Sequence, residues 1–236
     1  MHEQMLIKIS QIQQPRASLC AACGLMLPTA NANIIDSIYG AGASSFELGT
    51  FMDNGFGYMG LAPGATTITG WTVGGPGNGV DWLIEPTFGA QSGLHAVDLI
   101  NTSAGSVSTV IPTTPGQTYE LSFYAATIST GNALGTVSAG SLVNQSFTAP
   151  ISFSFANQAF APFSFFFTAT GPTSTVSFTS AVSGCFPDCY GPVVDSVSVD
   201  LASSVPEPSS IALLLLGGGV LCARARTSRH CGARNT

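Results

Sequence analysis

The sequence predicts an all-β fold, an antiparallel β-sandwich, for residues 33–203. Short runs of alternating apolar and polar residues recur along this region, and segments with the apolar period of a helix are absent from it. Turns rich in Gly, Pro and Asn separate these runs at intervals of about 8–12 residues. The two ends of the chain, 1–32 and 204–236, differ from this body in composition and are interpreted as targeting segments.

The alternation predicts strands in the following order, and their number favours a sandwich or a jelly roll: 34–39, 45–49, 66–73, 80–84, 93–99, 105–111, 118–125, 143–147, 151–155, 161–170, 174–180 and 193–201. Residues 50–64 are expected to form a loop, and 129–160 fits no clear pattern as a whole. The run Ser164–Thr168 is apolar on both faces, which predicts a central strand.

Strand periodicity in 193–201 places Asp195 on one face with Val193, Val197 and Val199. That face is expected to point into the core. A carboxylate on an inward face needs a partner, and residues 33–203 contain no Lys or Arg to provide one.

The charge distribution excludes some classes of function. All six basic residues lie in the terminal segments: Lys8, Arg16, Arg224, Arg226, Arg229 and Arg234. A body without cations cannot neutralise phosphates, so nucleic-acid binding is excluded and phosphorylated ligands are disfavoured. Carboxylates without basic partners can instead bind cations such as Ca²⁺.

The C-terminal segment combines three features. Val205, Pro206, Glu207 and Pro208 form an extended motif, because each proline fixes φ and disfavours helix in the residue before it. The apolar residues 209–223, as a helix, would span only ~22 Å of a hydrocarbon core of ~30 Å. The arginines of 224–236 would hold the far end on the cytoplasmic side. A transient membrane anchor is predicted, and an ordinary C-terminal anchor is the alternative.

This segment resembles the PEP-CTERM sorting signal of Gram-negative bacteria that produce exopolysaccharides. The resemblance covers about residues 204–229. It implies recognition by an exosortase-type membrane enzyme and export to the cell surface or extracellular matrix.

The N-terminal segment is typical of a secretory signal peptide. Lys8 and Arg16 precede an apolar run at 17–27, and the small-residue pattern Ala30-x-Ala32 predicts cleavage before Asn33. Met5 is an alternative start. Of the six cysteines, Cys185 and Cys189 remain in the body, where an oxidising compartment is expected to join them in a disulfide.

The body carries a second resemblance, to the DUF642 and choice-of-anchor group of galactose-binding-like jelly rolls. It spans about residues 44–201 and implies an extracellular, carbohydrate-binding protein. Five motifs carry it in order: Phe46-Glu47-x-Gly49, Ile68-x-Gly70-Trp71-x-Val73, Gly93-Leu94-His95-Ala96-Val97-Asp98-Leu99, Thr114-Pro115-Gly116-Gln117-Thr118-Tyr119, and Gly191-Pro192-Val193-Val194-Asp195.

Related jelly rolls hold a structural Ca²⁺ between an early Phe-Glu strand and a carboxylate of the last strand. The resemblance therefore implies that Glu47 and Asp195 bind Ca²⁺, and the unpaired Asp195 points independently to the same site. The alternative is that each carboxylate accepts only backbone or hydroxyl hydrogen bonds.

A sugar site needs an aromatic platform beside polar groups. Trp82 and Tyr58, with Asp81 and Asn78 nearby in sequence, are the predicted sugar-binding residues; core packing is the alternative for Trp82. Trp71 is expected in the core.

No catalytic residue is predicted. His95 lies within a strand without a nucleophile motif and is interpreted as structural. The sequence thus favours a non-catalytic, exported protein that binds extracellular polysaccharide. The alternatives are a self-associating matrix protein and a hydrolase that pairs carboxylates from Glu47, Glu85 and Glu120.

Overall fold

The computed structural model describes residues 33–129, 133–182 and 189–202, which form two antiparallel β-sheets and two short helical segments. The elements, in chain order, are α1 (Ile34–Tyr39), the 3-10 turn η1 (Ala43–Ser45), β1 (Tyr58–Leu61), β2 (Thr72–Gly74), β3 (Val80–Ile84), β4 (His95–Asp98), β5 (Ser106–Pro112), β6 (Thr118–Ala126), β7 (Ala133–Ala139), β8 (Leu142–Ala149), β9 (Ala161–Thr168), β10 (Thr173–Ser180) and β11 (Val193–Leu201).

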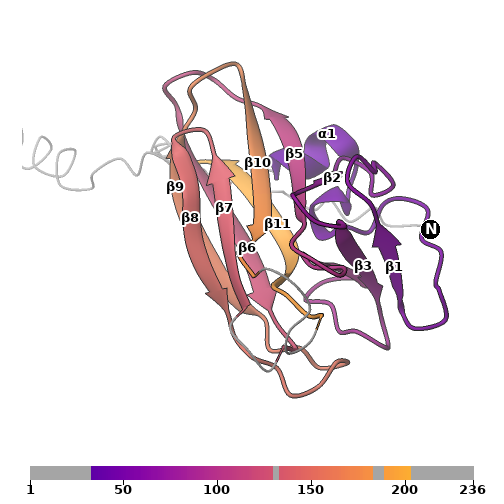
Figure 1. Ribbon diagram of the computed structural model, residues 1–236. Helices are drawn as coiled ribbons and strands as arrows, with labels where there is room; N and C mark the ends of the chain where they lie inside the picture. Colours follow the sequence, from indigo (N-terminus) through magenta and orange to yellow (C-terminus); the bar gives the residue numbers. More distant parts are fainter. Residues whose placement is uncertain (1–32, 130–132, 183–188, 203–236) are drawn as a thin grey trace, which may run out of the picture. The chain divides into compact units, whose positions relative to one another are not determined.

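The two sheets form a sandwich of the jelly-roll type, as the sequence predicts (Figure 1). One sheet has the strand order β1-β3-β4-β11-β6-β9 and the other β2-β5-β10-β7-β8. From β4 onward the chain passes between the sheets after every strand except at the β7–β8 hairpin. This repeated crossing brings strands that are distant in sequence, such as β4 and β11, side by side.

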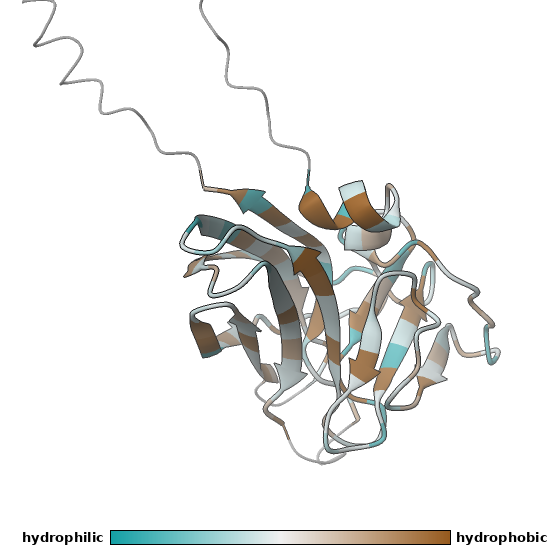
Figure 2. Ribbon diagram, turned by 90° about the horizontal axis from the view of Figure 1, so that it is seen from above, coloured by the Kyte–Doolittle hydropathy of each residue, from teal (hydrophilic) through white to brown (hydrophobic). Residues whose placement is uncertain are grey.

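The core lies between the sheets and is rich in aromatic rings. Phe123 on β6 contacts Phe178 on β10 and Phe147 on β8, with ring centroids 4.8 and 5.0 Å apart, so it joins the two layers. Buried and exposed residues alternate along β5, β6 and β10. Figure 2 shows this alternation as brown and pale bands along the strands. The period of two therefore decides which side chains fill the sandwich.

The first expected strand is a helix. Residues 34–39 form α1 because the Asn33 side chain caps its first turn, accepting the backbone N–H of Ile35 at 3.1 Å. The same side chain donates to the carbonyl of Val197 at 2.8 Å, and Ile35 is buried in the core. Residues 45–49 are likewise not a strand, since Phe46 adopts a left-handed φ of 61° and only Gly49 forms a bridge, to Ile68.

Two strands are missing from the sequence prediction. β1 lies within the expected loop 50–64, and β7 lies within the stretch that fits no pattern. β7 contains Gly135, opposite Phe147 on β8; a Cβ at Gly135 would lie 2.3 Å from the Phe147 ring. The glycine thus makes room for a core aromatic, and this weakens the strand signal in the sequence.

Two expected strands are shortened or absent. Within 66–73, only Thr72 and Val73 belong to a strand, β2. Residues 151–155 form a loop whose only pairing is a single bridge between Ile151 and Thr127.

The prediction of a central strand at Ser164–Thr168 is wrong, because β9 lies at the edge of its sheet. Phe163, Phe165 and Phe167 face the core, whereas Phe166 faces outward and is 61% exposed. Three consecutive phenylalanines therefore do not indicate burial on both faces here.

The predicted orientation of Asp195 is also wrong. The pairing of β11 with β6 shifts between Asp195 and Ser198, and Ser196 has a φ of 52°, so a bulge interrupts the alternation. Val194, Val197 and Val199 face the core. Asp195 lies with Val193 on the outer face of the six-stranded sheet, opposite Tyr124 on β6.

Several predictions concern residues outside the described ranges. These are the signal peptide 1–32, the motif Val205–Pro208, the apolar segment 209–223 with its arginine tail, and Cys185. Cys189 is described and is disulfide-bonded. Among the described residues, no helix has the length and hydropathy needed to cross a membrane.

Neighbouring residues of β9 provide a test of the fold. Phe167→Ala should lower the free energy of unfolding by about 3–5 kcal/mol, because it removes a ring that is 1% exposed. Phe166→Ala should change it by less than about 1 kcal/mol. Urea unfolding of both variants measures the difference. Equal losses would contradict the outward, exposed position of Phe166 on β9.

Candidate functional site

The outer face of the six-stranded sheet carries both a polar and an apolar region. Side chains alternate along β3, so Val80 and Trp82 point into the core while Asp81 and Leu83 point outward. Register places Asp81 opposite Asp98 on β4, and Leu83 opposite Tyr58 on β1. Polar and aromatic groups from three strands therefore meet on one surface.

A cavity of about 440 Å³ lies over this face. One part of its lining is polar and the other part is aromatic or apolar. It is lined by Asp81, Asp98, Asn101 and Thr102, together with Tyr58, Leu83, Phe88, Cys189 and Tyr190.

Asp81 provides an accepting group in this cavity. Its Oδ1 accepts a hydrogen bond from Asn101 Nδ2 at 2.9 Å, and its Oδ2 accepts none from the described residues. Burial raises the pKa of Asp81 to about 6, and the Asn101 bond opposes this rise. Gly60 leaves room for the pair, because a Cβ there would lie 2.6 Å from Asn101 Nδ2.

Asp98 has a positioning role. It is 1% exposed, and its Oδ1 accepts the backbone N–H groups of Ile100 and Gly191, each at 3.0 Å. The carboxylate thereby ties the end of β4 to the segment that carries Tyr190.

A second cavity, of about 370 Å³, adjoins the first and is aromatic. It shares Tyr58, Phe88 and Tyr190 with the polar cavity and adds Phe56, Thr87 and Phe155. The Phe155 ring lies 5.6 Å from Phe88 and 5.3 Å from Tyr190, both edge to face. The two cavities together form a groove with ring faces beside oxygen and amide groups.

The structure brings together only part of the predicted sugar site. Tyr58 and Asp81 line the groove. Asn78 lies beside it, because its side-chain amide donates to the hydroxyl of Thr102. Trp82 is 1% exposed and its Nε1 donates to the carbonyl of Phe46 at 3.1 Å, so the indole is a core side chain and cannot serve as a platform.

Five residues of the groove are not predicted from the sequence: Asp98, Asn101, Thr102, Phe88 and Tyr190. Asp98 lies two residues after Ala96 on β4, so both side chains are on the outer face of the sheet. The alternation of the strand could have indicated this position for Asp98. Asn101 and Tyr190 lie in loops, and only the fold brings them to Asp81.

The predicted calcium ligands, Glu47 and Asp195, both accept hydrogen bonds from one loop. Asp195 Oδ2 accepts the backbone N–H groups of Gln91 and Ser92 at 2.7 and 3.0 Å. Glu47 Oε1 accepts those of Leu94 and His95 at 3.0 and 2.8 Å. Both carboxylates thus hold the loop Gln91–Leu94 from opposite sides of Gly93.

Gly93 is required at the centre of this arrangement. Its φ of 71° is left-handed, and a Cβ would lie 2.4 Å from the carboxyl carbon of Glu47. A side chain at this position would displace the Glu47 carboxylate from the loop.

The electrostatics of the pair are unfavourable without a cation. Asp195 is fully buried, and burial raises its pKa to about 7. Hydrogen bonds from the N–H groups of Ser92, Gln91 and Ser196 lower the pKa, while the charge of Glu47 raises it further. No Lys or Arg occurs within the described residues to neutralise the two groups.

Both carboxylates accept backbone N–H groups, as the alternative to calcium binding predicts. Glu47 Oε2 accepts no hydrogen bond from the described residues and could bind a hard cation that prefers oxygen ligands. The described residues contain no group of three or more His, Cys, Asp and Glu side chains that could hold a metal ion.

His95 has a structural environment, in agreement with its interpretation from the sequence. It is buried, its Nδ1 lies 2.9 Å from the carbonyl of Leu83, and its ring packs between Trp82 and Phe51.

Comparison with known families identifies the chain. Residues 43–200 match the family described as a protein of unknown function, DUF642, and the chain belongs to this family. Residues 204–229 match the PEP-CTERM protein-sorting motif, so the chain carries this motif after its β-sandwich. No curated protein matches the sequence.

Solved structures similar to this chain include carbohydrate-binding modules. A family 35 module from Clostridium thermocellum shares 16% identity over 56% of this chain and 92% of that module, with a TM-score of 0.41. TmCBM61, solved with β-1,4-galactotriose, shares 13% identity over 69% of this chain and 97% of its own, with a TM-score of 0.45. A xylan-binding domain from Paenibacillus barcinonensis shares 12% identity over 63% of this chain and 94% of that domain, with a TM-score of 0.42.

The raised pKa of Asp195 predicts the pH dependence of stability. In the cation-free protein the folded state retains the Asp195 proton up to about pH 7, whereas the unfolded chain releases it near 3.8. Between these two pKa values the folded state therefore binds more protons than the unfolded chain does. The free energy of unfolding should accordingly fall as pH rises from 5 to 7.5. Urea unfolding in EDTA measures this slope.

Asp195→Asn is the matched variant for this experiment. It should flatten the slope between pH 6 and 7.5, while the contribution of Asp81 should persist up to about pH 6. If the slope above pH 6 is the same in this variant as in the wild-type protein, Asp195 is not the group that titrates there.

Proposed function

We propose that this protein is an exported, non-catalytic carbohydrate-binding protein of the cell surface or extracellular matrix, and that its ligand is an extracellular polysaccharide. The observation that carries the proposal is the groove over β1, β3 and β4, in which aromatic rings lie beside a carboxylate, an amide and a hydroxyl. Sugar rings present apolar C–H faces and hydroxyl edges, and this lining matches both.

The chemistry of the groove supports a sugar over other ligands. Tyr58 and Tyr190 supply ring faces with polar tips, and Asp81 can accept sugar hydroxyls through its free Oδ2. The described residues contain no Lys or Arg, which disfavours phosphorylated or nucleic-acid ligands.

The sorting motif supports the proposed location. PEP-CTERM residues 204–229 would direct processing by an exosortase-type enzyme. The apolar segment 209–223 would anchor the chain transiently in the inner membrane before the sandwich domain reaches the surface.

The calcium ion proposed at Glu47 and Asp195 would be structural. It would fasten the loop Gln91–Leu94, which follows directly on Thr87 and Phe88 in the wall of the groove. Cation binding would thereby hold the aromatic wall in place for the ligand.

Sugar binding is tested by affinity electrophoresis in gels containing β-1,4-galactan, xylan or a β-glucan. The wild-type protein should be retarded in at least one gel. Asp81→Asn should weaken the affinity by about 10- to 100-fold, because a hydrogen bond to a charged acceptor is lost. Tyr190→Ala should weaken it by removing a ring face.

Phe166→Ala is the control, since this exposed ring lies on β9 at the opposite edge of the sheet from β1. It should bind as the wild-type protein does. Retardation that survives both Asp81→Asn and Tyr190→Ala would refute this groove as the binding site.

Calcium binding is tested by thermal unfolding in CaCl₂ and in EDTA. A ligand at 100-fold its Kd adds ~2.7 kcal/mol, so Tm should rise by roughly 5–10 °C. Glu47→Gln should abolish the rise, because the amide oxygen can still accept the N–H groups of Leu94 and His95 but the charge is lost. The same Tm in CaCl₂ and EDTA for the wild-type protein would exclude the site.

A further inference from the structure

The loop Ile151–Phe155, between β8 and β9, displays apolar side chains to solvent. Phe153 is 100% exposed, and Phe155 and Ile151 are about half exposed. Serines alternate with these residues at 152 and 154. An aromatic side chain with no cover is unfavourable in water, so this exposure calls for an explanation.

The loop is held in a defined conformation, so the exposure does not follow from a lack of local structure. Ser152 N–H donates to the carbonyl of Thr127 at 2.6 Å. The Ser152 hydroxyl accepts the N–H of Ala159 at 2.7 Å, and the Ser154 hydroxyl accepts that of Asn157 at 3.2 Å. The serines thus fix the loop while the rings project outward.

The loop is also joined to the wall of the groove. Gly89 N–H donates to the carbonyl of Phe155 at 2.7 Å, and Gln158 Nε2 donates to the carbonyl of Gly89 at 3.1 Å. Gly89 directly follows Phe88, which lines both cavities of the groove.

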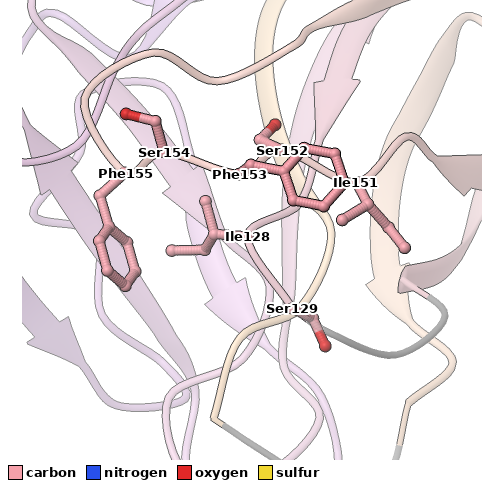
Figure 3. A pocket seen from close by; sticks show the side chains of 7 residues that line it. All are labelled: Ile128, Ser129, Ile151, Ser152, Phe153, Ser154 and Phe155. Carbon is pink, nitrogen blue, oxygen red and sulfur yellow. The ribbon is translucent and has the colours of Figure 1, made fainter.

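A third cavity, of about 350 Å³, lies at this loop. Figure 3 shows the Ile128 side chain between the rings of Phe155 and Phe153, with Ser152 next to Phe153 and the Ser154 hydroxyl pointing away from both rings. The Ser154 hydroxyl accepts a backbone N–H and retains its own hydrogen, whereas Ser152 is only 6% exposed. The lining of the cavity is therefore mainly apolar, from Phe153, Phe155, Ile128 and Ile151.

This cavity neighbours the groove, because Phe155 lines both it and the aromatic cavity. The order along the surface is the polar cavity at Asp81, the aromatic cavity at Phe88 and Tyr190, and then the cavity at Phe153. Among the described residues, no charged side chain lines the second or the third cavity.

We infer that the loop Ile151–Phe155 forms an extension subsite, and that the ligand is a stretch of polysaccharide several sugar units long, with uncharged units over Phe155 and Phe153. This inference rests on the proposed sugar-binding function of the groove. A single sugar or a disaccharide would occupy the cavities at Asp81 and Phe88 and leave Phe153 uncovered. A longer chain continues across Phe155 and covers the exposed ring.

The test is calorimetric titration of the protein with galacto-, xylo- and cello-oligosaccharides of one to six units. For the series that binds, the hexamer should bind at least about tenfold more tightly than the dimer. Phe153→Ala should remove this gain and leave dimer affinity unchanged. Asp81→Asn should weaken binding of oligosaccharides of every length. Phe166→Ala, which removes another exposed phenylalanine, should change neither the affinity for the disaccharide nor the gain with length.

The outcomes separate this inference from the proposed function. Dimers that bind as tightly as hexamers, or a length gain that survives Phe153→Ala, would overturn the extension subsite and leave the groove intact. Absence of binding by every oligosaccharide and polysaccharide would overturn both. Light scattering tests whether the wild-type protein forms a homodimer that Phe153→Ala converts to a monomer. Such a result would show that a second copy of the chain covers the Phe153 ring, and it would also overturn the inference.

Discussion

The attachment of one loop to β11 is the constraint on which the site depends. Asp195 and Glu47 hold Gln91–His95 through four backbone N–H groups, and Gly93 leaves room for the Glu47 carboxylate. The residues just before this loop supply Phe88 and the carbonyl that Gln158 binds. The groove wall and the loop at Phe153 therefore both depend on two acidic side chains.

The described residues contain no Lys or Arg, so these acids are stabilised by hydrogen bonds and not by ion pairs with Lys or Arg. Buried carboxylates here accept backbone N–H groups, as Asp98 does from Ile100 and Gly191 and Asp195 does from Gln91 and Ser92. Such bonds fix loops in place and leave the charge unneutralised. Burial and the charge of Glu47 raise the pKa of Asp195, and the backbone N–H bonds oppose this rise.

Under the proposed function, the residues that stabilise the sandwich differ from those that would bind the ligand. Its core is built from inward-facing residues such as Phe123, Trp71 and Trp82, which are buried and contact no cavity of the groove. The groove is built from the opposite face of β1, β3 and β4 and from loops that close over it. Substitutions in the groove can therefore alter recognition while the aromatic core holds the fold.

The sequence by itself determined the β-sandwich, most of its strands and the sorting motif, because local alternation and short motifs record these features. That Glu47 and Asp195 act on one part of the fold was implied by the resemblance to related jelly rolls, and alternation gave the wrong face for Asp195. Only the tertiary structure decided which way Trp82 and Asp195 point. Trp82 and Leu83 are both apolar, so alternation cannot tell the core face from the outer face, and the bulge at Ser196 reverses the expected face of Asp195. The meeting of Asp81, Asn101 and Tyr190 depends on strand register and on long-range contacts, which no local pattern contains.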